Sequence, residues 1–215
     1  MAVEYRDIDL PGDRVAAAPD GRVSWINGWR TLGSPEDLKV AADGSVTLSA
    51  GADLSDPKPL GTLLLPQNEY HQEFTATVVP TDGVAAGIAV WANSSHHYSA
   101  LVRRESGQLI LRFRKRVQDL TVQEEHVLDS DEEVRLTIEA EASVYRFFAD
   151  AGGKRTVVGE GAASLLSAEN IAWFTNVNFM LAVVGTDTNK GSAVFSNVAR
   201  NPRETVPPRP FTIPR

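Results

Sequence analysis

From Val134 to Ala142 the sequence reads VRLTIEAEA, and apolar and polar side chains alternate along it. A repeat of two residues places the apolar set on one face of an extended chain, which is typical of a half-buried β-strand. The same alternation recurs in four further stretches, Glu73–Val79, Gln108–Val117, Tyr145–Asp150 and Ala193–Val198. These stretches predict a protein built mainly of strands that each turn one face to a core.

Two other stretches, Ala85–Ala92 and Phe179–Val184, are apolar almost throughout, and we interpret them as strands covered on both faces. Clusters of Gly, Asn, Asp and Ser between the strands are typical of tight turns. Only Ala162–Asn170 has the pattern of a short helix. Many short strands without a sequence repeat pack most economically as two layers, so the sequence predicts an all-β fold, a jelly-roll β-sandwich of two antiparallel sheets.

Composition excludes several classes of protein. The 215 residues carry a net charge of -7 and include no cysteine, which rules out disulfides, thiolate metal sites and a cysteine nucleophile. An acidic chain repels phosphate, so no nucleic-acid partner is expected. No apolar stretch approaches the roughly 20 residues of a membrane-spanning helix, and we expect no membrane partner either.

The two ends of the chain differ from its middle. The N-terminal MAVEYRDIDLPGD has charges where a signal peptide needs an apolar segment, which predicts a cytoplasmic protein or a module excised from a longer one. We expect residues 1–24 to form a strap or linker and residues 25–201 to form the β-sandwich. Residues 202–215 are proline-rich and are expected to form an extended tail.

Several motifs occur in an order that is found in a known family. They are AGIAVW at 86–91, SHHY at 95–98, LILRFRKRV at 109–117, YRF at 145–147 and WFT at 173–175. In order and spacing they resemble the C-terminal concanavalin A-like β-sandwich of family 43 glycoside hydrolases, mostly β-xylosidases and arabinofuranosidases. That module is also described as carbohydrate-binding module family 91. The resemblance covers about Trp25 to Asn201.

The resemblance implies a concanavalin A-like fold and a non-catalytic, lectin-like module that binds xylan or related hemicellulose. The catalytic propeller of the family, which holds its catalytic carboxylates, has no counterpart in this sequence. An alternative is an accessory subunit that docks on a separate family 43 propeller, where Phe174 matches the residue that helps to close the active site. The family usually reads Gly-Phe-Thr-Gly where this chain has Trp173 to Asn176, so the turn must be built differently.

Sugar rings present an apolar face edged with hydroxyl groups, so a binding surface needs exposed aromatic rings with hydrogen-bonding neighbours. The candidate ligand-binding residues of this kind are Trp91, His96, His97, Tyr98, Trp173 and Phe174. A tryptophan in an apolar strand is also typical of a core, and a buried turn anchor is the corresponding alternative for Phe174. A row of guanidinium groups, Arg112, Arg114 and Arg116, could bind a uronic-acid carboxylate or form a solvated face paired with glutamates.

A third function class is a concanavalin-like glycoside hydrolase. Glu139 and Glu141 are the only strand carboxylates at a spacing that would let two of them reach one glycosidic bond, and they are weak catalytic candidates. Adjacent His96 and His97 point to opposite faces of a strand and cannot share a metal ion, so no metal site is expected. The closing strand lacks the family's aspartates, so we expect no cofactor, and a structural calcium ion has no support in the sequence.

Overall fold

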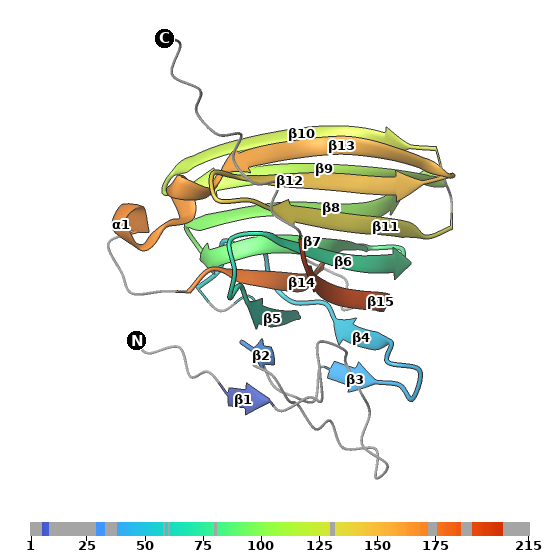
Figure 1. The fold of residues 1–215 in the computed structure, drawn as a ribbon. Coiled ribbons are helices and arrows are strands. Elements are labelled where there is room, and N and C mark those ends of the chain that lie inside the picture. The colour runs from blue at the N-terminus through green and yellow to red at the C-terminus, as the bar shows by residue number, and fades with distance from the viewer. Residues whose placement is uncertain are drawn as a thin grey trace.

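The protein forms two antiparallel β-sheets that are stacked face to face (Figure 1). The computed structural model describes residues 6–8, 29–32, 38–57, 59, 61–79, 81–129, 132–171, 176–185 and 191–203. In this part of the chain, the larger sheet has the strand order β1-β2-β5-β14-β7-β8-β9-β10 and the smaller sheet has the order β13-β12-β11-β6-β15-β4-β3. The predicted fold class, a jelly-roll sandwich of two antiparallel sheets, is confirmed.

The strands of the larger sheet are β1 (Arg6–Ile8), β2 (Trp29–Thr31), β5 (Thr62–Pro66), β14 (Asn178–Gly185), β7 (Val84–Asn93), β8 (His96–Glu105), β9 (Gln108–Val117) and β10 (Leu120–Leu128). Those of the smaller sheet are β13 (Lys154–Ala162), β12 (Val144–Ala151), β11 (Val134–Ala140), β6 (Gln72–Val79), β15 (Ser192–Pro202), β4 (Val46–Ser49) and β3 (Leu38–Val40). A 3-10 turn, η2 (Ala163–Leu166), and the single-turn helix α1 (Ala168–Ile171) lie at one end of the sandwich (Figure 1).

Each of the seven stretches singled out in the sequence falls on a strand, although β11 ends at Ala140, two residues before the end of the stretch Val134–Ala142, and the short helix expected within 162–170 is present as η2 and α1. The alternation did not mark β5, β8, β10 or β13. Within the expected N-terminal strap, residues 6–8 pair with β2 as an edge strand. Residues 204–215 of the expected tail lie outside the described residues. No helix in the described part of the chain is long and apolar enough to cross a membrane.

The inward faces of the two sheets form one continuous core. Phe74 on β6 and Phe179 on β14 face each other from opposite sheets, with their rings stacked and the centroids 5.1 Å apart. Phe113 on β9 and Phe147 on β12 also meet across the layers with their centroids 5.1 Å apart, but their rings are tilted by 55°. All four side chains are at most 3% exposed, so aromatic contacts across the layers stabilise the sandwich through burial of apolar surface.

At the centre of the larger sheet the chain comes so close to its neighbour that only glycine fits. A Cβ atom added at Gly87 on β7 would lie 2.1 Å from the carbonyl oxygen of Ala100 on β8, and 3.0 Å from a methyl group of Leu136 in the opposite sheet. The backbone atoms of β8 cannot move aside without breaking the ladder of β7, β8 and β9. Gly87 therefore sets the close approach of these strands.

One face of the larger sheet points away from the main core and is partly covered by the chain. Leu54, from the segment between β4 and β5, is fully buried there and packs in a second apolar cluster that includes Trp91, Met180 and Leu64. The backbone of Gly51 fixes the same segment, because its N–H donates to Val183 and its carbonyl accepts from Gly185. This covering segment therefore buries part of the outer face of the larger sheet.

The two sheets meet at one open side, where the edge strands β10 and β13 lie side by side (Figure 1). The Nε2 atom of His126 lies 3.0 Å from the carbonyl oxygen of Val158 and links the two edges. Most of β10 is exposed to solvent, and Leu120 and Val122 are 71% and 54% exposed. Among the described residues no further strand pairs with β10, so this edge is an outer one there and is partly apolar.

Candidate functional site

Trp91 and Tyr98 are core residues, and the expectation that they form a sugar-binding platform is wrong. Trp91 is 3% exposed within the second apolar cluster, and Tyr98 is fully buried between the sheets. The Tyr98 hydroxyl donates a 2.9 Å hydrogen bond to the carbonyl of Ala162, and a Cβ atom at Gly161 would lie 2.4 Å from its ring. A ring packed on both sides offers no face to a ligand, and the competing structural interpretation holds for both residues.

His96 and His97 are also buried, at 6% and 0% exposure, so neither is available to a ligand at the surface. Both rings contact Asn93: His96 Nδ1 lies 3.2 Å from its side-chain oxygen, and His97 Nδ1 lies 3.4 Å from its backbone oxygen. Burial and the neighbouring Arg114 charge lower the pKa of His97 to about 4. His97 is therefore neutral at physiological pH, and its Nε2, 3.3 Å from Arg114, can accept a hydrogen bond.

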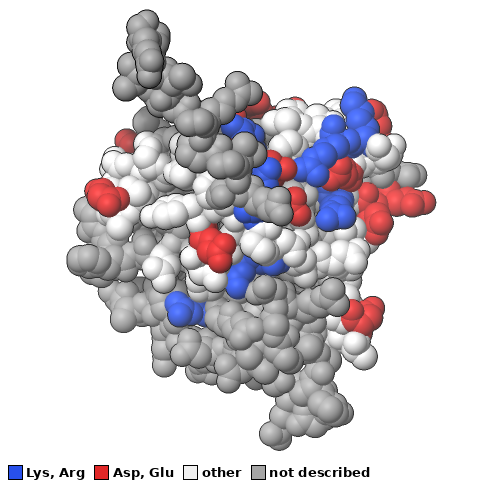
Figure 2. All heavy atoms as spheres, in the orientation of Figure 1, with Lys and Arg blue, Asp and Glu red and all other residues white. Residues whose placement is uncertain are grey.

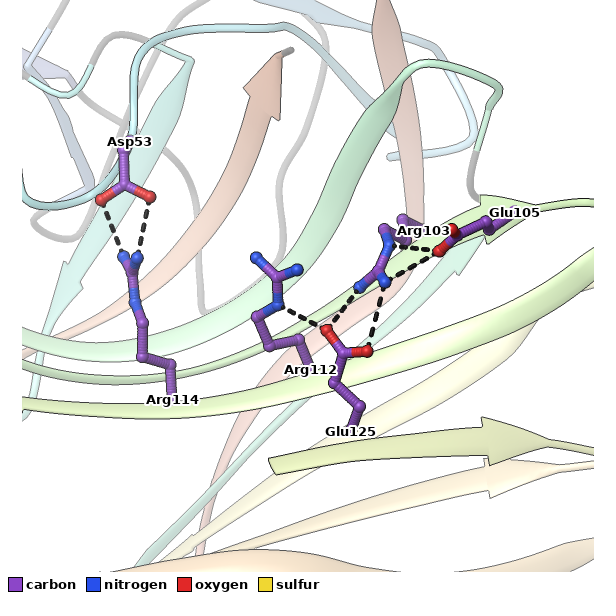
Figure 3. A network of polar contacts seen from close by, with 6 residues as sticks. All are labelled: Asp53, Arg103, Glu105, Arg112, Arg114 and Glu125. Atoms are coloured by element: carbon purple, nitrogen blue, oxygen red, sulfur yellow. Dashed lines mark hydrogen bonds and ion pairs between the residues drawn. The ribbon is translucent and has the colours of Figure 1, made fainter. Parts of the chain in front are cut away.

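The arginine row projects from β9 to the outer face of the larger sheet, and two of its members are held by carboxylates (Figure 3). Both terminal amino groups of Arg114 donate to Asp53 at 2.9 Å, which fastens the covering segment to β9. Burial raises the pKa of Asp53, but the hydrogen bonds from Arg114 and Ser55 outweigh it and hold the pKa below its usual range. Arg112 donates through Nε to Glu125 at 2.9 Å.

Glu139 and Glu141 form ion pairs on the outer face of the smaller sheet. The guanidinium of Arg203 bridges the two carboxylates, at 3.1 Å from Glu139 and 3.5 Å from Glu141. Arg155 binds Glu139 and Arg146 binds Glu141, both at 2.9 Å. Each carboxylate is thus engaged by two arginine side chains of the protein itself. Basic and acidic side chains are interspersed in the same way over the face seen in Figure 2.

Trp173 and Phe174 lie outside the described residues. Ser167, before them in the sequence, and Asn176, after them, line a pocket of about 660 Å³ at the end of the sandwich that carries η2 and α1. Four segments form its walls: residues 67–70 after β5, 141–143 between β11 and β12, 163–167, and 176–177 before β14. The pocket therefore gathers loops from both sheets at one end, which is where binding residues are commonly placed on a rigid β scaffold.

Tyr70 is the exposed aromatic side chain of this pocket, with 75% of its surface open to solvent. Its loop is fixed by Gln67, whose backbone N–H donates to Val177 at 2.9 Å and whose side-chain Nε2 donates to Glu69 at 2.7 Å. The hydroxyl of Tyr145 donates to Gln67 Oε1 at 2.7 Å. Burial raises the pKa of Tyr145 to about 12, so this donor keeps its proton at physiological pH.

The pocket around Tyr70 is lined by amide side chains, hydroxyl groups and two carboxylates, Glu69 and Glu141. Amide side chains come from Asn68 and Asn176, and hydroxyl groups come from Ser143, Ser164 and Ser167. Asn68 is oriented by Gln72, whose Nε2 donates to Asn68 Oδ1 at 2.6 Å. Such amides and hydroxyls can both donate and accept, which matches the hydroxyl rim of a neutral sugar.

Our sequence reasoning did not identify Tyr70. It searched the strands and the motifs of the family, while Tyr70 stands in QNEYH, a short polar stretch at 67–71 that follows the apolar Leu63-Leu64-Leu65. An aromatic residue flanked only by polar residues was the available signal, since no strand pattern gives it a reason to be buried. Within the described residues, no group of three or more His, Asp or Glu side chains is placed to hold a metal ion.

Comparison with solved structures places the fold among family 43 glycoside hydrolase proteins. "Xyloglucan PUL GH43B" of Bacteroides ovatus matches 93% of this chain with a TM-score of 0.72 and 21% identity. A xylan beta-1,4-xylosidase from Bacillus halodurans C-125 matches 94% of it, with a TM-score of 0.72 and 15% identity. This chain spans only 38% and 39% of the lengths of those two proteins.

A functionally unknown protein from Saccharomyces cerevisiae has the same fold over 96% of its own chain, covering 82% of this one, with a TM-score of 0.59 and 14% identity. No curated protein sequence matches this chain significantly. The sequence pattern of the family described as "Beta xylosidase C-terminal Concanavalin A-like domain" matches residues 26–199. This chain therefore belongs to the family of concanavalin A-like domains found at the C-terminus of β-xylosidases, as the resemblance of its motifs predicted.

Proposed function

We propose that this domain binds a neutral saccharide, without catalysis, in the pocket around Tyr70. The observation that carries the proposal is the exposed phenol ring of Tyr70 at the rim of a pocket lined by amides and hydroxyl groups. An apolar sugar face can stack on the ring while its hydroxyl groups exchange hydrogen bonds with Asn68 and Asn176. A volume of about 660 Å³ is within the range of small-molecule sites.

The saccharide class we propose is xylan or a related hemicellulose. Support comes from the family and from the two named proteins of similar fold, one described with xyloglucan and the other as a xylosidase. Trp173 and Phe174 remain proposed ligand contacts, since Ser167 and Asn176, on either side of them in the sequence, both line the pocket. We expect dissociation constants between about 1 μM and 1 mM, because few rings stack and binding costs freedom of motion.

Replacement of Tyr70 by alanine tests the site. We expect Tyr70→Ala to weaken binding of xylo-oligosaccharides about tenfold, because it removes the stacking surface but no buried contact. Isothermal titration calorimetry with xylotetraose and xylohexaose measures the change directly. Tyr70→Phe keeps the ring and should retain most of the affinity.

Leu120→Ala is the matched control, because Leu120 is 71% exposed and lies on β10, away from the pocket lining. Its affinity for the same oligosaccharides should equal that of the wild type. Equal affinities of Tyr70→Ala and the wild type would remove Tyr70 from the site. The proposed function would be rejected if the wild type showed no measurable binding to fragments of xylan, xyloglucan or glucan at ligand concentrations up to about 5 mM. A dissociation constant above roughly this value would be too weak for a binding domain.

A second candidate function is docking on a family 43 catalytic domain. This candidate is favoured because the region that matches this chain is less than half of each matched glycoside hydrolase, so in those proteins the fold is joined to a further part of the same chain. If it is correct, mixing this chain with a separately produced family 43 propeller should give a complex of summed mass in light scattering. The docking function would be contradicted if adding this chain at up to about 100 μM, roughly the dissociation constant of a weak complex, changed neither the mass nor the activity of the propeller.

A further inference from the structure

A second depression lies on the outer face of the larger sheet, at the other end of β14 from the Tyr70 pocket. It consists of two adjoining pockets of about 410 Å³ and about 50 Å³, which share Ala85, Arg103, Arg112 and Val184. The Tyr70 pocket borders the residues before β14, whereas this depression borders its last two residues, Val184 and Gly185. The two sites are therefore separate. We call this second depression the arginine groove.

Small side chains line the arginine groove between its arginines. Ala85 on β7 and Ser99 and Leu101 on β8 belong to its lining, together with Val184. Ser99 is 1% exposed and is paired with Arg114 on the neighbouring strand. Short side chains at these positions leave a shallow space in which a ring can approach the sheet, while longer arginine side chains stand at its border.

The arginines differ in how many of their donors are used (Figure 3). Arg103 donates through Nε and Nη2 to Glu105 and through Nη1 to Glu125. Arg114 uses both terminal amino groups on Asp53. Each of these guanidinium groups is occupied by protein carboxylates and has little capacity left for a ligand.

Arg112 is the exception among the arginines of the smaller pocket. Its Nε donates to Glu125 at 2.9 Å, and Figure 3 shows its two terminal amino groups directed away from that carboxylate with no partner among the residues drawn. No hydrogen bond of these amino groups is recorded within the described part of the chain, and the side chain is 42% exposed. Glu125 therefore fixes the plane of the guanidinium and leaves its end-on pair of donors facing the groove.

We propose that Arg112 binds the carboxylate of a uronic acid carried by an oligosaccharide. Two parallel N–H donors in one plane match the two oxygens of a carboxylate, and a fork already oriented by Glu125 loses less freedom on binding. The sugar ring of the uronic acid lies over the short side chains between β7 and β8. This site is independent of the proposed neutral-saccharide site, because the two share no lining residue.

The test compares an oligosaccharide that carries glucuronic acid with the same oligosaccharide after reduction of the carboxyl group to an alcohol. Calorimetry with the wild type should give an affinity about fivefold higher for the acid, and Arg112→Gln should abolish that preference. Arg112→Lys keeps the positive charge but not the pair of parallel N–H donors, and it should lose most of the preference for the acid. Equal affinities of the wild type for the two ligands, or a preference that survives in Arg112→Gln, would overturn the assignment.

Arg155→Gln is a close control, since Arg155 is 44% exposed and also pairs with one glutamate at 2.9 Å, but on the other sheet. It should keep the full preference for the acid, as should Tyr70→Ala, which separates this site from the neutral one. Carboxylates could also come from an acidic protein segment, so a short acidic peptide is used as a competitor of the uronic oligosaccharide. Competition by the peptide as strong as that by the uronic oligosaccharide would show a general anion site and reject the saccharide assignment.

Discussion

Gly87→Ala is expected to destabilise the protein by at least about 3 kcal/mol. The new methyl group would lie 2.1 Å from the carbonyl oxygen of Ala100, and real Cβ contacts are essentially never this short. The neighbour is backbone in the centre of the larger sheet, so relief requires β7 and β8 to separate. The free energy of unfolding of a typical domain is only about 5–15 kcal/mol. The urea concentration at the midpoint of unfolding should therefore fall by a large fraction of its wild-type value.

The same substitution at Gly107, in the turn between β8 and β9, separates the effect of contact from that of backbone conformation. Gly107 has φ of +82°, and a Cβ atom there meets nothing within 4 Å. Gly107→Ala should therefore cost only about 1 kcal/mol, from the strained dihedral alone. Comparable losses for the two variants would show that the close approach at Gly87 does not limit stability.

Acidification is expected to destabilise the protein between pH 6.5 and pH 4 through His97. Burial lowers the pKa of His97 from 6.5 to about 4, so in this window the unfolded chain binds a proton that the folded chain refuses. The free energy of unfolding should be complete above pH 6.5 and fall by about 1.4 kcal/mol for each pH unit below it, on the order of 3 kcal/mol in all. Urea unfolding at half-unit pH intervals measures this slope.

His97→Gln should flatten most of the slope, although it also lowers stability at neutral pH because a buried ring is lost. A smaller slope should remain, since burial also lowers the pKa of His96. The prediction fails if proton NMR of the wild-type protein shows the His97 ring titrating near pH 6.5.

Further acidification acts on Asp53. Its pKa lies below the usual range, so below about pH 4 an unfolded Asp53 takes up a proton while the folded carboxylate stays bound to Arg114. The stabilising contribution of this pair is thus present above pH 4 and is lost as the pH falls towards the folded pKa. Asp53→Asn should remove this part of the acid sensitivity and leave the His97 slope in place.

Alternation predicted the fold because most strands of the sandwich bury one face and expose the other. The strand β11 shows this directly, with Leu136 and Ile138 fully buried and Arg135 exposed. The strand β10 could not be found in this way because its residues are exposed on both faces, which erases the two-residue period. In β13, Gly159 and Gly161 lie against Phe113 and Tyr98, so glycines stand where alternation would place apolar side chains, and Val158 alone among its valines is buried in the core.

The site was harder to predict than the fold because sequence patterns do not show which aromatic residues are covered. Trp91 and Tyr98 were sensible candidates, but the covering segment around Leu54 buries the first and contact between the sheets buries the second. The ion pairs of Arg114 and Glu139 join residues far apart in the sequence, Asp53 and Arg203. Only the folded chain shows that these groups are occupied while Tyr70 and Arg112 are open.

The edge strand β10 has a consequence for contacts between molecules. An edge with exposed Leu120 and Val122 could template the addition of another strand and so begin aggregation. Glu124 and Glu125 stand in the middle of that edge. Glu125 is already paired with Arg103 and Arg112, but a second molecule that aligned its own β10 antiparallel, with Glu124 opposite Glu124, would bring like charges together. We therefore expect Glu124 to disfavour this pairing between copies along the open side of the sandwich.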